Sequence, residues 1–443
     1  MTSAPKRQIN GMSAFIVVWI GQIVSILATS MSQFALTIWA YEKTQSATAL
    51  GLMQVFFITP FLLISPIAGA MVDRHNRKLM MMLSDLGAGF ATILILVLQA
   101  AGALQIWHLY LTAAITGLFS SFQWPAYSAS ISLMIPKEQL GRANGLMSLM
   151  EAGPGVIAPL LAGALLPLVH LTGILLFDVM TFVLAVAALS IIFVPKPPKT
   201  EEGKQGQGSL LKEAAYGFRY IFARPSLLGL QMVFFLGNLF AGIGFTVLAP
   251  MILSRTGNSE IAFGAVQTAG AIGGVIGGIL MSVWGGPKRR VHGVLFGHVL
   301  SGLCWVLLMG PGRGLIAWAA SSFLSSLLVA PINGSNQAIW QSKVALDVQG
   351  RVFSARRLIA WLTNPISPLI AGVVADQWLE PAFRNQTPFA QSFSWLVGDG
   401  PGAGMSLMFI VCGAMMSLTG ALAYLFPAVR NAEDILPDAQ PHV

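Results

Sequence analysis

Apolar runs long enough to cross a bilayer recur along the whole chain, and short polar stretches separate them. A helix needs about 20 mostly apolar residues to span about 30 Å of hydrocarbon. We therefore expect an all-α, polytopic membrane protein with twelve transmembrane helices. These helices are predicted near residues 13–39, 47–71, 79–101, 106–134, 139–168, 171–194, 226–253, 261–284, 291–310, 314–340, 352–377 and 403–427.

The longest polar stretch inside the chain, residues 196–208 (KPPKTEEGKQGQG), has no periodicity and contains helix breakers. It predicts a linker between two six-helix halves. The next stretch, residues 209–223, predicts an amphipathic helix on the cytoplasmic surface. We accordingly expect an N-terminal half (1–194), a cytoplasmic linker with this helix (195–225) and a C-terminal half (226–443).

Motifs repeat between the two halves at a constant spacing. APLLAG at 158–163 returns as SPLIAG at 367–372, and Gly141-Arg142 returns as Gly350-Arg351, in both cases 209 residues later. Such a repeat indicates two pseudo-symmetric halves related by an axis along the membrane normal. A binding cavity is expected at their interface, open to either side in turn.

The amino-acid composition also indicates that the protein is embedded in a lipid bilayer. Hydrophobic residues make up 55% of the chain and charged residues only 9%, whereas soluble proteins carry about 25% charged residues. The net charge of +8 is spread in short clusters between apolar runs, with no basic face or arm to follow phosphates. We expect lipid as a partner and no nucleic acid.

The positions of the basic residues predict the topology. Of the 25 Lys and Arg residues, 21 fall on the side that carries the N-terminus and the linker, and four fall on the other side: Lys43, Arg255, Arg313 and Arg384. The positive-inside rule therefore predicts that both termini are cytoplasmic, in a multi-pass protein of the inner cell membrane.

Several chemistries are missing from the sequence. It contains no G-x-x-x-x-G-K-[ST] phosphate loop, no ligand spacing among its six His and two Cys residues, and no nucleophile–base constellation. We expect no enzyme activity, no cofactor and no metal, in a protein that acts as a monomer.

A family resemblance is carried by GAMVDRHNRK at residues 69–78, between the second and third predicted helices. It resembles the G-x-x-x-D-R-x-x-R-K loop signature of the major facilitator superfamily. Together with the helix number and the repeat, the resemblance covers essentially the whole chain. WIGQ at 19–22, WPA at 124–126 and GRVFS at 350–354 are similar to the branch of macrolide-efflux proteins and the enterobactin exporter. The resemblance implies secondary active transport by alternating access.

The 69–78 loop also has a physical interpretation of its own. Asp73 with Arg74, Arg77 and Lys78 predicts a gating latch, because a carboxylate among basic groups locks helix ends by charge-assisted hydrogen bonds. Topology alone would explain the basic residues but not Asp73. The second copy, GGPKRR at 285–290, lacks the aspartate, so the first copy should be the stronger latch.

The predicted fifth helix carries Gly153, Pro154, Pro159 and Gly163. This run is similar to the Gly-Pro-rich antiporter signature of exporters in the superfamily, with Ala158 where glycine is usual. The resemblance favours export over import. Simple helix packing by small residues is the alternative.

Glu151 and Asp178 are the candidates for proton coupling. Glu151 is expected near mid-membrane, where an ionised carboxylate costs about 2.5–3.5 kcal/mol. A buried ion pair with Arg356 or Arg357 is the alternative role for Glu151, and a structural role is the alternative for Asp178. Residues 112–123 contain no basic residue, although many proton-coupled exporters of the family have an arginine in this helix.

Polar and aromatic residues of the first, fourth, seventh and tenth predicted helices suggest the lining of a substrate cavity. A large apolar pocket with a few amides suits amphipathic solutes, although each residue is also able to brace helices. The candidates are Gln22, Gln33, Gln123, Trp124, Tyr127, Asn238, Asn333, Asn336 and Gln337.

These observations predict a secondary active transporter that exports a small amphipathic compound (a drug, siderophore or peptide-like metabolite) by proton-driven antiport. One alternative is an uptake symporter of the same superfamily. Another is a membrane-embedded enzyme or lipid-handling protein, which would need clustered membrane-facing catalytic groups that the sequence does not show.

Overall fold

The computed structural model describes residues 11–44, 47–191, 208–257 and 259–439, and all regular secondary structure in these ranges is helical. The long helices before the linker are α1 (Gly11–Thr44), α2 (Ala47–Arg74), α3 (Arg77–Ala100), α4 (Ile106–Met134) and α5 (Leu140–Ile191). Those after it are α7 (Leu210–Phe222), α8 (Pro225–Arg255), α9 (Glu260–Trp284), α10 (Arg290–Cys304), α11 (Leu315–Lys343), α12 (Gln349–Trp361), α13 (Thr363–Val373) and α16 (Ala403–Ala423). The short elements are η1 (Lys137–Gln139), η2 (Trp305–Met309), η3 (Val374–Leu379), α14 (Glu380–Arg384), α15 (Pro388–Val397), α17 (Pro427–Arg430) and α18 (Ala432–Ile435).

The chain doubles back inside α5. The break lies at His170, whose φ of 56° is non-helical. Leu140 and Leu189, from the two ends of α5, pack in the same core cluster. The two limbs of α5 therefore cross the bundle in opposite directions, as the predicted helices 139–168 and 171–194 require.

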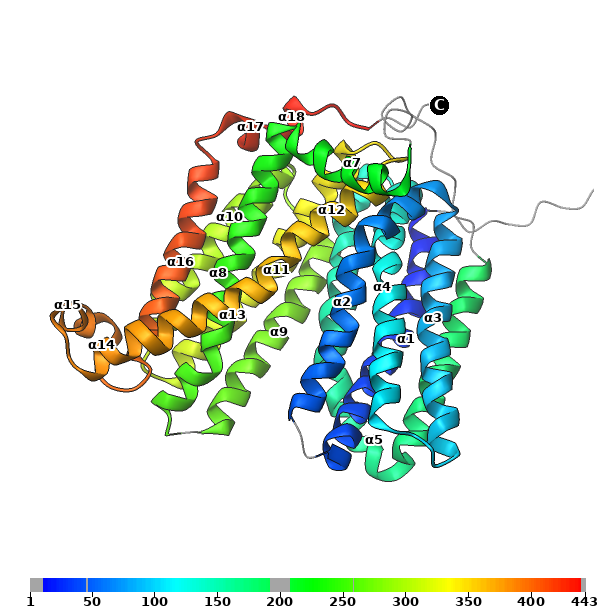
Figure 1. Cartoon of the computed structure of the whole chain (residues 1–443). Coiled ribbons are helices and arrows are strands. Elements are labelled where there is room, and N and C mark those ends of the chain that lie inside the picture. The colour runs from blue at the N-terminus through cyan, green and yellow to red at the C-terminus, as the bar shows by residue number, and fades with distance from the viewer. Residues whose placement is uncertain (1–10, 45–46, 192–207, 258, 440–443) are drawn as a thin grey trace, which may run out of the picture.

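Ten helices of the described chain are long and apolar enough to cross a membrane. α5 is one of these ten but supplies two crossings. α4 falls outside the ten because residues such as Ser120, Ser121 and Gln123 make it more polar. It nevertheless packs along α2 and α3 (Figure 1). With α4 included, the described residues give the twelve crossings that the sequence predicts.

The crossings form two bundles that lie side by side (Figure 1). α1 to α5 make one bundle, and α8 to α16 make the other; α5 contacts α9 and α11 across the seam, and α2 contacts α12. Each bundle has its own buried apolar clusters. Large apolar side chains such as Leu160, Leu168 and Ile316 are exposed on the outside, which suits a surface solvated by lipid tails.

One end of the molecule carries α7, α17 and α18, and the opposite end carries α14 and α15 (Figure 1). We call the first of these the α7 end. α1 begins there, since Phe15 shares a core cluster with Ile135 and Leu140. The first residues of α1 and the short helices after α16 thus lie at the same end. The terminal residues 1–10 and 440–443 lie outside the described ranges, as does the predicted linker up to residue 207.

α7 is an amphipathic helix that begins directly after the described part of the linker region. Ser209 caps its N-terminus by accepting a hydrogen bond from the Lys212 N–H. Its buried face includes Gly217, Tyr220 and Ile221, and it packs on α2 and α12. α7 therefore touches both bundles.

The predicted helix 352–377 is corrected by the structure. α12 ends at Trp361, α13 begins at Thr363, and a π-helical segment follows from Val374 to Leu379. Pro365 has no N–H to donate to the Trp361 carbonyl, so the regular helix is broken at this point. The predicted helix 291–310 also changes to π-helical geometry, at Trp305.

Candidate functional site

A central cavity of about 710 Å³ lies between the two bundles, with walls from α1, α2, α4 and α5 on one side and α8, α11 and α12 on the other. Its apolar wall includes Ile26, Phe57, Phe61, Met147 and Trp361. Seven of the nine residues predicted for a cavity line it: Gln22, Gln123, Trp124, Tyr127, Asn238, Asn333 and Gln337.

The other two predicted residues lie elsewhere. Gln33 lines a separate cavity of about 160 Å³ inside the first bundle. Asn336 is buried, and its Oδ1 accepts a hydrogen bond from Trp340 Nε1 at 3.1 Å. Asn333 and Gln337 are four residues apart and share a helix face, whereas the side chain of Asn336 is engaged by Trp340.

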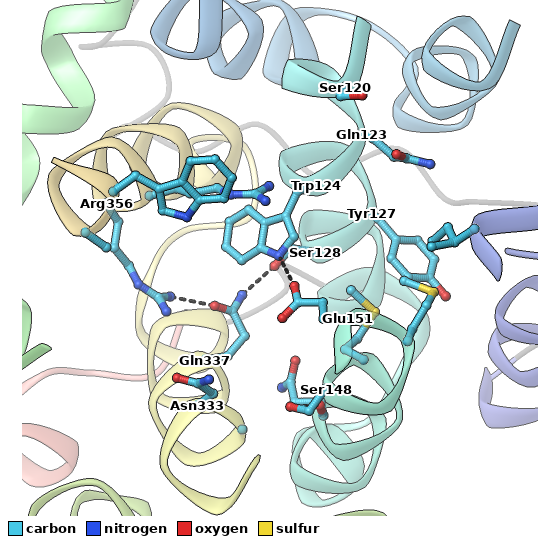
Figure 2. A pocket seen from close by; sticks show the side chains of 18 of the residues that line it. Ser120, Gln123, Trp124, Tyr127, Ser128, Ser148, Glu151, Asn333, Gln337 and Arg356 are labelled. Carbon is cyan, nitrogen blue, oxygen red and sulfur yellow. Dashed lines mark hydrogen bonds between the residues drawn. The ribbon is translucent and has the colours of Figure 1, made fainter. Parts of the chain in front are cut away.

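Glu151 of α5 borders the central cavity, and its Oε1 accepts a hydrogen bond from Trp124 Nε1 at 3.1 Å. Figure 2 shows the carboxylate pointing toward Trp124, on the opposite side of the cavity from Arg356. Among the described residues, no salt bridge joins Glu151 to Arg356 or Arg357. Both guanidinium groups lie near enough to interact with it electrostatically. The ion pair considered as an alternative from the sequence is therefore not formed in this conformation.

Arg356 and Arg357 themselves line the central cavity, although the count of basic residues placed them on the cytoplasmic side, in the predicted helix 352–377. Arg356 Nη1 donates a hydrogen bond to Gln337 Oε1 at 2.6 Å. Arg357 lies over three rings, with its Cζ 5.3 Å from the ring centre of Phe61 and 4.8 Å from those of Trp124 and Trp361. Two adjacent arginines inside an apolar run were the signal that they face the protein interior.

Polar contacts cross between the bundles beside the cavity. Gln337 of α11 donates through Nε2 to the Ser128 hydroxyl of α4 (Figure 2). Asn144 Nδ2 of α5 donates to Gln341 Oε1 of α11 at 2.7 Å, and Gln341 Nε2 donates to the Ser128 carbonyl at 2.9 Å. These contacts lie between the cavity and the α7 end, and they hold the two bundles together there. Neither Asn144 nor Gln341 was singled out from the sequence.

A buried carboxylate lies behind two of the lining amides. Asp85 of α3 accepts hydrogen bonds from Gln22 Nε2 at 2.8 Å and from Gln123 Nε2 at 2.9 Å. Both of its oxygens thus have a donor. The amides separate this charge from the central cavity.

Asp178 borders the smaller cavity and not the central one. It accepts hydrogen bonds from the hydroxyls of Thr29 at 2.8 Å and Thr92 at 3.2 Å. The two candidates for coupling, Glu151 and Asp178, are therefore not brought together. Each has its own cavity and its own donors.

The predicted latch residue Asp73 lies at the α7 end, between α2 and the first turn of α12. Its Oδ1 accepts the N–H of Gly350 at 2.7 Å, and its Oδ2 accepts the N–H of Arg351 at 2.9 Å and Arg351 Nε at 3.1 Å. The Asp73 side chain is 2% exposed and that of Arg351 is 4% exposed. A buried carboxylate of one bundle thus holds a helix N-terminus and a guanidinium of the other.

The three basic residues of the loop have different partners. Arg74 makes a two-pronged bond to Glu213 of α7, with N–O distances of 2.9 and 3.0 Å. Arg77 is buried, lies 3.8 Å from Asp73, and donates to the carbonyls of Ala129 and of Leu346 in the other bundle. Lys78 donates to the Ser190 carbonyl within the first bundle. Only Arg77 accompanies Asp73 across the seam.

The second copy of the loop packs without a carboxylate. A Cβ atom built on Gly141 of α5 would lie 1.7 Å from the carbonyl oxygen of Gly285, directly after α9. Beside this contact, Arg290 donates to the carbonyl of Lys137. The start of α5 therefore meets the second copy as the start of α12 meets the first, with backbone contact in place of an ion pair.

In the antiporter-like run, Pro154 lines the central cavity. Cβ atoms built on Gly153 and Gly163 would meet nothing within 4 Å outside their own turn of helix. These two glycines therefore do not mediate a close contact with another helix in this conformation.

The chain after α18 joins the bundles a second time. Asp438 lies 3.2 Å from Lys137 Nζ and 3.0 Å from Lys343 Nζ, at the ends of η1 and α11. Burial acts to raise the pKa of the Asp438 carboxyl, but hydrogen bonds from the two ammonium groups hold this pKa below its usual value. Because Asp438 is half exposed, we expect this contact to be weak and sensitive to salt.

Two bundles related by an internal repeat, with a cavity between them and joined helix ends on one side, are the architecture of secondary transporters. A family model described as Major Facilitator Superfamily matches residues 18–368, and the chain belongs to this family. It is accordingly a multi-pass membrane transporter of small molecules and not an enzyme.

Named relatives and solved structures agree. The chain is 25% identical over 365 residues to macrolide efflux protein A of Streptococcus pyogenes, covering 82% of this chain and 89% of that protein. It is 24% identical over 368 residues to multidrug resistance protein 1 of Bacillus subtilis, with 81% and 86% covered. Its fold is similar to that of the transporter FucP in the outward conformation, with a TM-score of 0.67 at 13% identity over 93% of this chain and 98% of that one. A bacterial homologue of ferroportin gives a TM-score of 0.63 at 17% identity over 92% and 99%.

Proposed function

We propose that this transporter exports a small amphipathic compound from the cell by proton-driven antiport. The observation that carries the proposal is the central cavity: its wall combines apolar and aromatic side chains with amides, serine hydroxyls and three charged groups. Such a lining favours solutes with a large apolar body and a few polar groups. Proteins named for macrolide and multidrug efflux are similar along most of the chain, which supports export over uptake.

The conformation has a direction if the α7 end faces the cytoplasm, as the Lys and Arg distribution predicts. Arg74, Arg77, Lys137, Arg289 and Arg290 all lie at this end. The joined end is then the cytoplasmic one, and the structure corresponds to an outward-facing state of a protein in the inner membrane. Opening the Asp73 contacts is the step that returns the cavity to the cytoplasm.

Glu151 is the proposed proton site. It borders the cavity, has one hydrogen-bond donor in Trp124, and has no salt bridge among the described residues. A proton and a substrate therefore have access to the same carboxylate. Asp178 is the second candidate, but its two threonine donors lie in a different cavity. A membrane potential of 100 mV supplies about 2.3 kcal/mol per charge moved, enough for a gradient of roughly 50-fold.

Accumulation assays test the direction of transport. A host lacking its own efflux pumps is transformed with the gene, and the cellular content of erythromycin, ethidium and norfloxacin is followed. Export predicts a lower content of at least one compound, restored to the control level by a protonophore. A higher content of every compound that responds would contradict export and favour the uptake symporter. Purified protein examined by light scattering in detergent tests whether it is a monomer.

A further inference from the structure

In the central cavity, a negatively charged residue and a positively charged residue contact the same side chain, the indole of Trp124. The indole N–H of Trp124 donates to Glu151 at 3.1 Å, and the face of the same indole lies 4.8 Å from the Arg357 guanidinium carbon. A carboxylate and a guanidinium thus flank one ring without forming a salt bridge among the described residues. Each charge is left with capacity for a ligand.

The two arginines differ in this capacity. Arg356 donates to Gln337 Oε1 at 2.6 Å and lies 5.1 Å from the ring centre of Trp340. Arg357 contacts only ring faces: within the described part of the chain, none of its N–H groups donates a hydrogen bond. Cation–π contacts position a guanidinium but leave its in-plane donors free. Arg357 therefore presents a donor fork that matches a carboxylate.

The walls beside these charges are aromatic. Phe61 of α2 and Trp361 of α12 stack with centroids 4.8 Å apart, and both contact Arg357. Tyr127 lines the cavity on the same helix as Trp124. A flat apolar ligand body is able to stack against the cavity-facing side of such rings, with one end near Arg357 and the other near Glu151.

We propose that the substrates are amphipathic zwitterions, with a carboxylate that binds Arg357, a protonated amine that binds Glu151 and an aromatic body against Trp124, Phe61 and Trp361. This inference rests on the proposed function, because it names the substrate class of the same cavity. A substrate with a single charge would leave either Glu151 or Arg357 without a counter-charge in a partly desolvated site.

The arrangement also explains antiport. A proton on Glu151 removes the charge that attracts the amine, so proton and substrate compete for one carboxylate. The charged groups that face the cavity near Glu151 are Arg356 and Arg357, and Tyr127 is a further titratable lining group. Asp85 is screened from the cavity by the amides that bind it. A purely anionic substrate would instead favour protonation of Glu151, which corresponds to symport.

Three probes on one scaffold test the assignment: norfloxacin, which is a zwitterion near neutral pH, its ethyl ester, which is a cation, and its N-acetyl derivative, which is an anion. Affinities are measured on purified full-length protein at pH 7.5 by quenching of tryptophan fluorescence. We expect norfloxacin to bind about tenfold more tightly than either analogue. Arg357→Gln should lower the norfloxacin affinity to that of the ester, and Glu151→Gln should lower it to that of the N-acetyl derivative.

Equal affinities for norfloxacin and the ester would identify a cation site, and equal affinities for norfloxacin and the N-acetyl derivative would identify an anion site. Either result, or no binding of any probe, overturns the assignment. The order of the three probe affinities on the unmodified protein is sufficient to test the assignment, so a variant that fails to fold does not affect the test. Uptake into inverted vesicles separates the two proposals: if the ester accumulates as well as norfloxacin, export stands and the zwitterion assignment falls. If the probes bind in the expected order but none accumulates, the zwitterion assignment stands and the export proposal falls.

Discussion

Gly69 of α2 and Gly350 of α12 lie backbone to backbone across the seam between the bundles. A Cβ atom on Gly69 would come within 2.4 Å of the Gly350 carbonyl oxygen, and one on Gly350 within 2.5 Å of the Gly69 carbonyl oxygen. The same approach brings Asp73 within reach of two backbone N–H groups of α12. The absence of a side chain at both positions is therefore a requirement of the closed α7 end.

Gly350→Ala should open the α7 end, because a methyl group cannot fit against a backbone carbonyl. Overpacking costs about 1–3 kcal/mol, so we expect the opening equilibrium to rise about 5- to 150-fold. A cysteine introduced at the buried Ala338, with Cys304 and Cys412 replaced by alanine, reports opening through its rate of maleimide labelling. Gly372→Ala is the matched control, since its Cβ meets nothing within 4 Å. Equal labelling in the two variants would refute the steric argument.

Asp73→Asn should reduce transport at least tenfold while the protein inserts and folds. The change preserves size but removes the carboxylate charge that pairs with buried Arg351, and breaking a buried pair costs about 3–5 kcal/mol. Initial efflux rates at matched expression measure the effect. Asp434→Asn serves as the control, because its bond to Arg289 is more than half exposed. Wild-type efflux from a well-expressed Asp73→Asn protein would leave the loop with a topological role only.

Substrate affinity should rise with pH in the unmodified protein and lose this dependence in Glu151→Gln. The deprotonated carboxylate binds the amine, and a proton displaces it, so acid weakens binding. Titration of norfloxacin affinity over the pH range in which norfloxacin stays a zwitterion checks the expectation, because the protonation state of the probe is then constant. Asp178→Asn should keep the wild-type profile. A flat profile in Asp178→Asn together with a normal one in Glu151→Gln would transfer the coupling role to Asp178.

The docking of α7 should be lost in acid. Burial acts to raise the pKa of Glu213, but hydrogen bonds from Arg74 and from the Gly208 N–H hold it below its usual value. A lowered pKa means that this stabilisation is complete above the ordinary value of about 4.3 and disappears as pH falls through the folded value. Protease cleavage next to α7 should increase below about pH 4. In Glu213→Gln, cleavage should already be fast at neutral pH and independent of pH.

Both termini should report the cytoplasm. The prediction follows from the Lys and Arg distribution. Arg356 and Arg357 line the cavity, so they do not count as residues of the cytoplasmic surface, but the other basic residues still favour this side. Reporter fusions at Val443 and within residues 196–208 measure the side directly. An external location for either fusion would reverse the orientation and, with it, the outward-facing interpretation.

The sequence predicted the fold well because hydrocarbon thickness allows few alternatives to long apolar helices. Its errors concern contacts between distant segments. Gln22 and Gln33 are 11 residues apart on one face of α1, yet they line different cavities because depth in the bilayer is not encoded in helical periodicity. The latch loop was recognisable from its residue types, whereas its partner at Arg351, 278 positions away, depends on how the bundles pack.

The two seams at the α7 end are built differently although they derive from one repeat. The first, at Asp73, depends on charge and directional hydrogen bonds, which are lost at once when the helices part. The second, where Gly141 meets Gly285, depends on close backbone contact with the Arg290–Lys137 hydrogen bond beside it and has no carboxylate. Because of this difference, we expect the first seam to act as the latch that separates and the second to act as the hinge that stays in contact. We therefore predict that the halves swing about the α5–α9 edge, so that the α7 end opens on the side of α2 and α12, beneath α7.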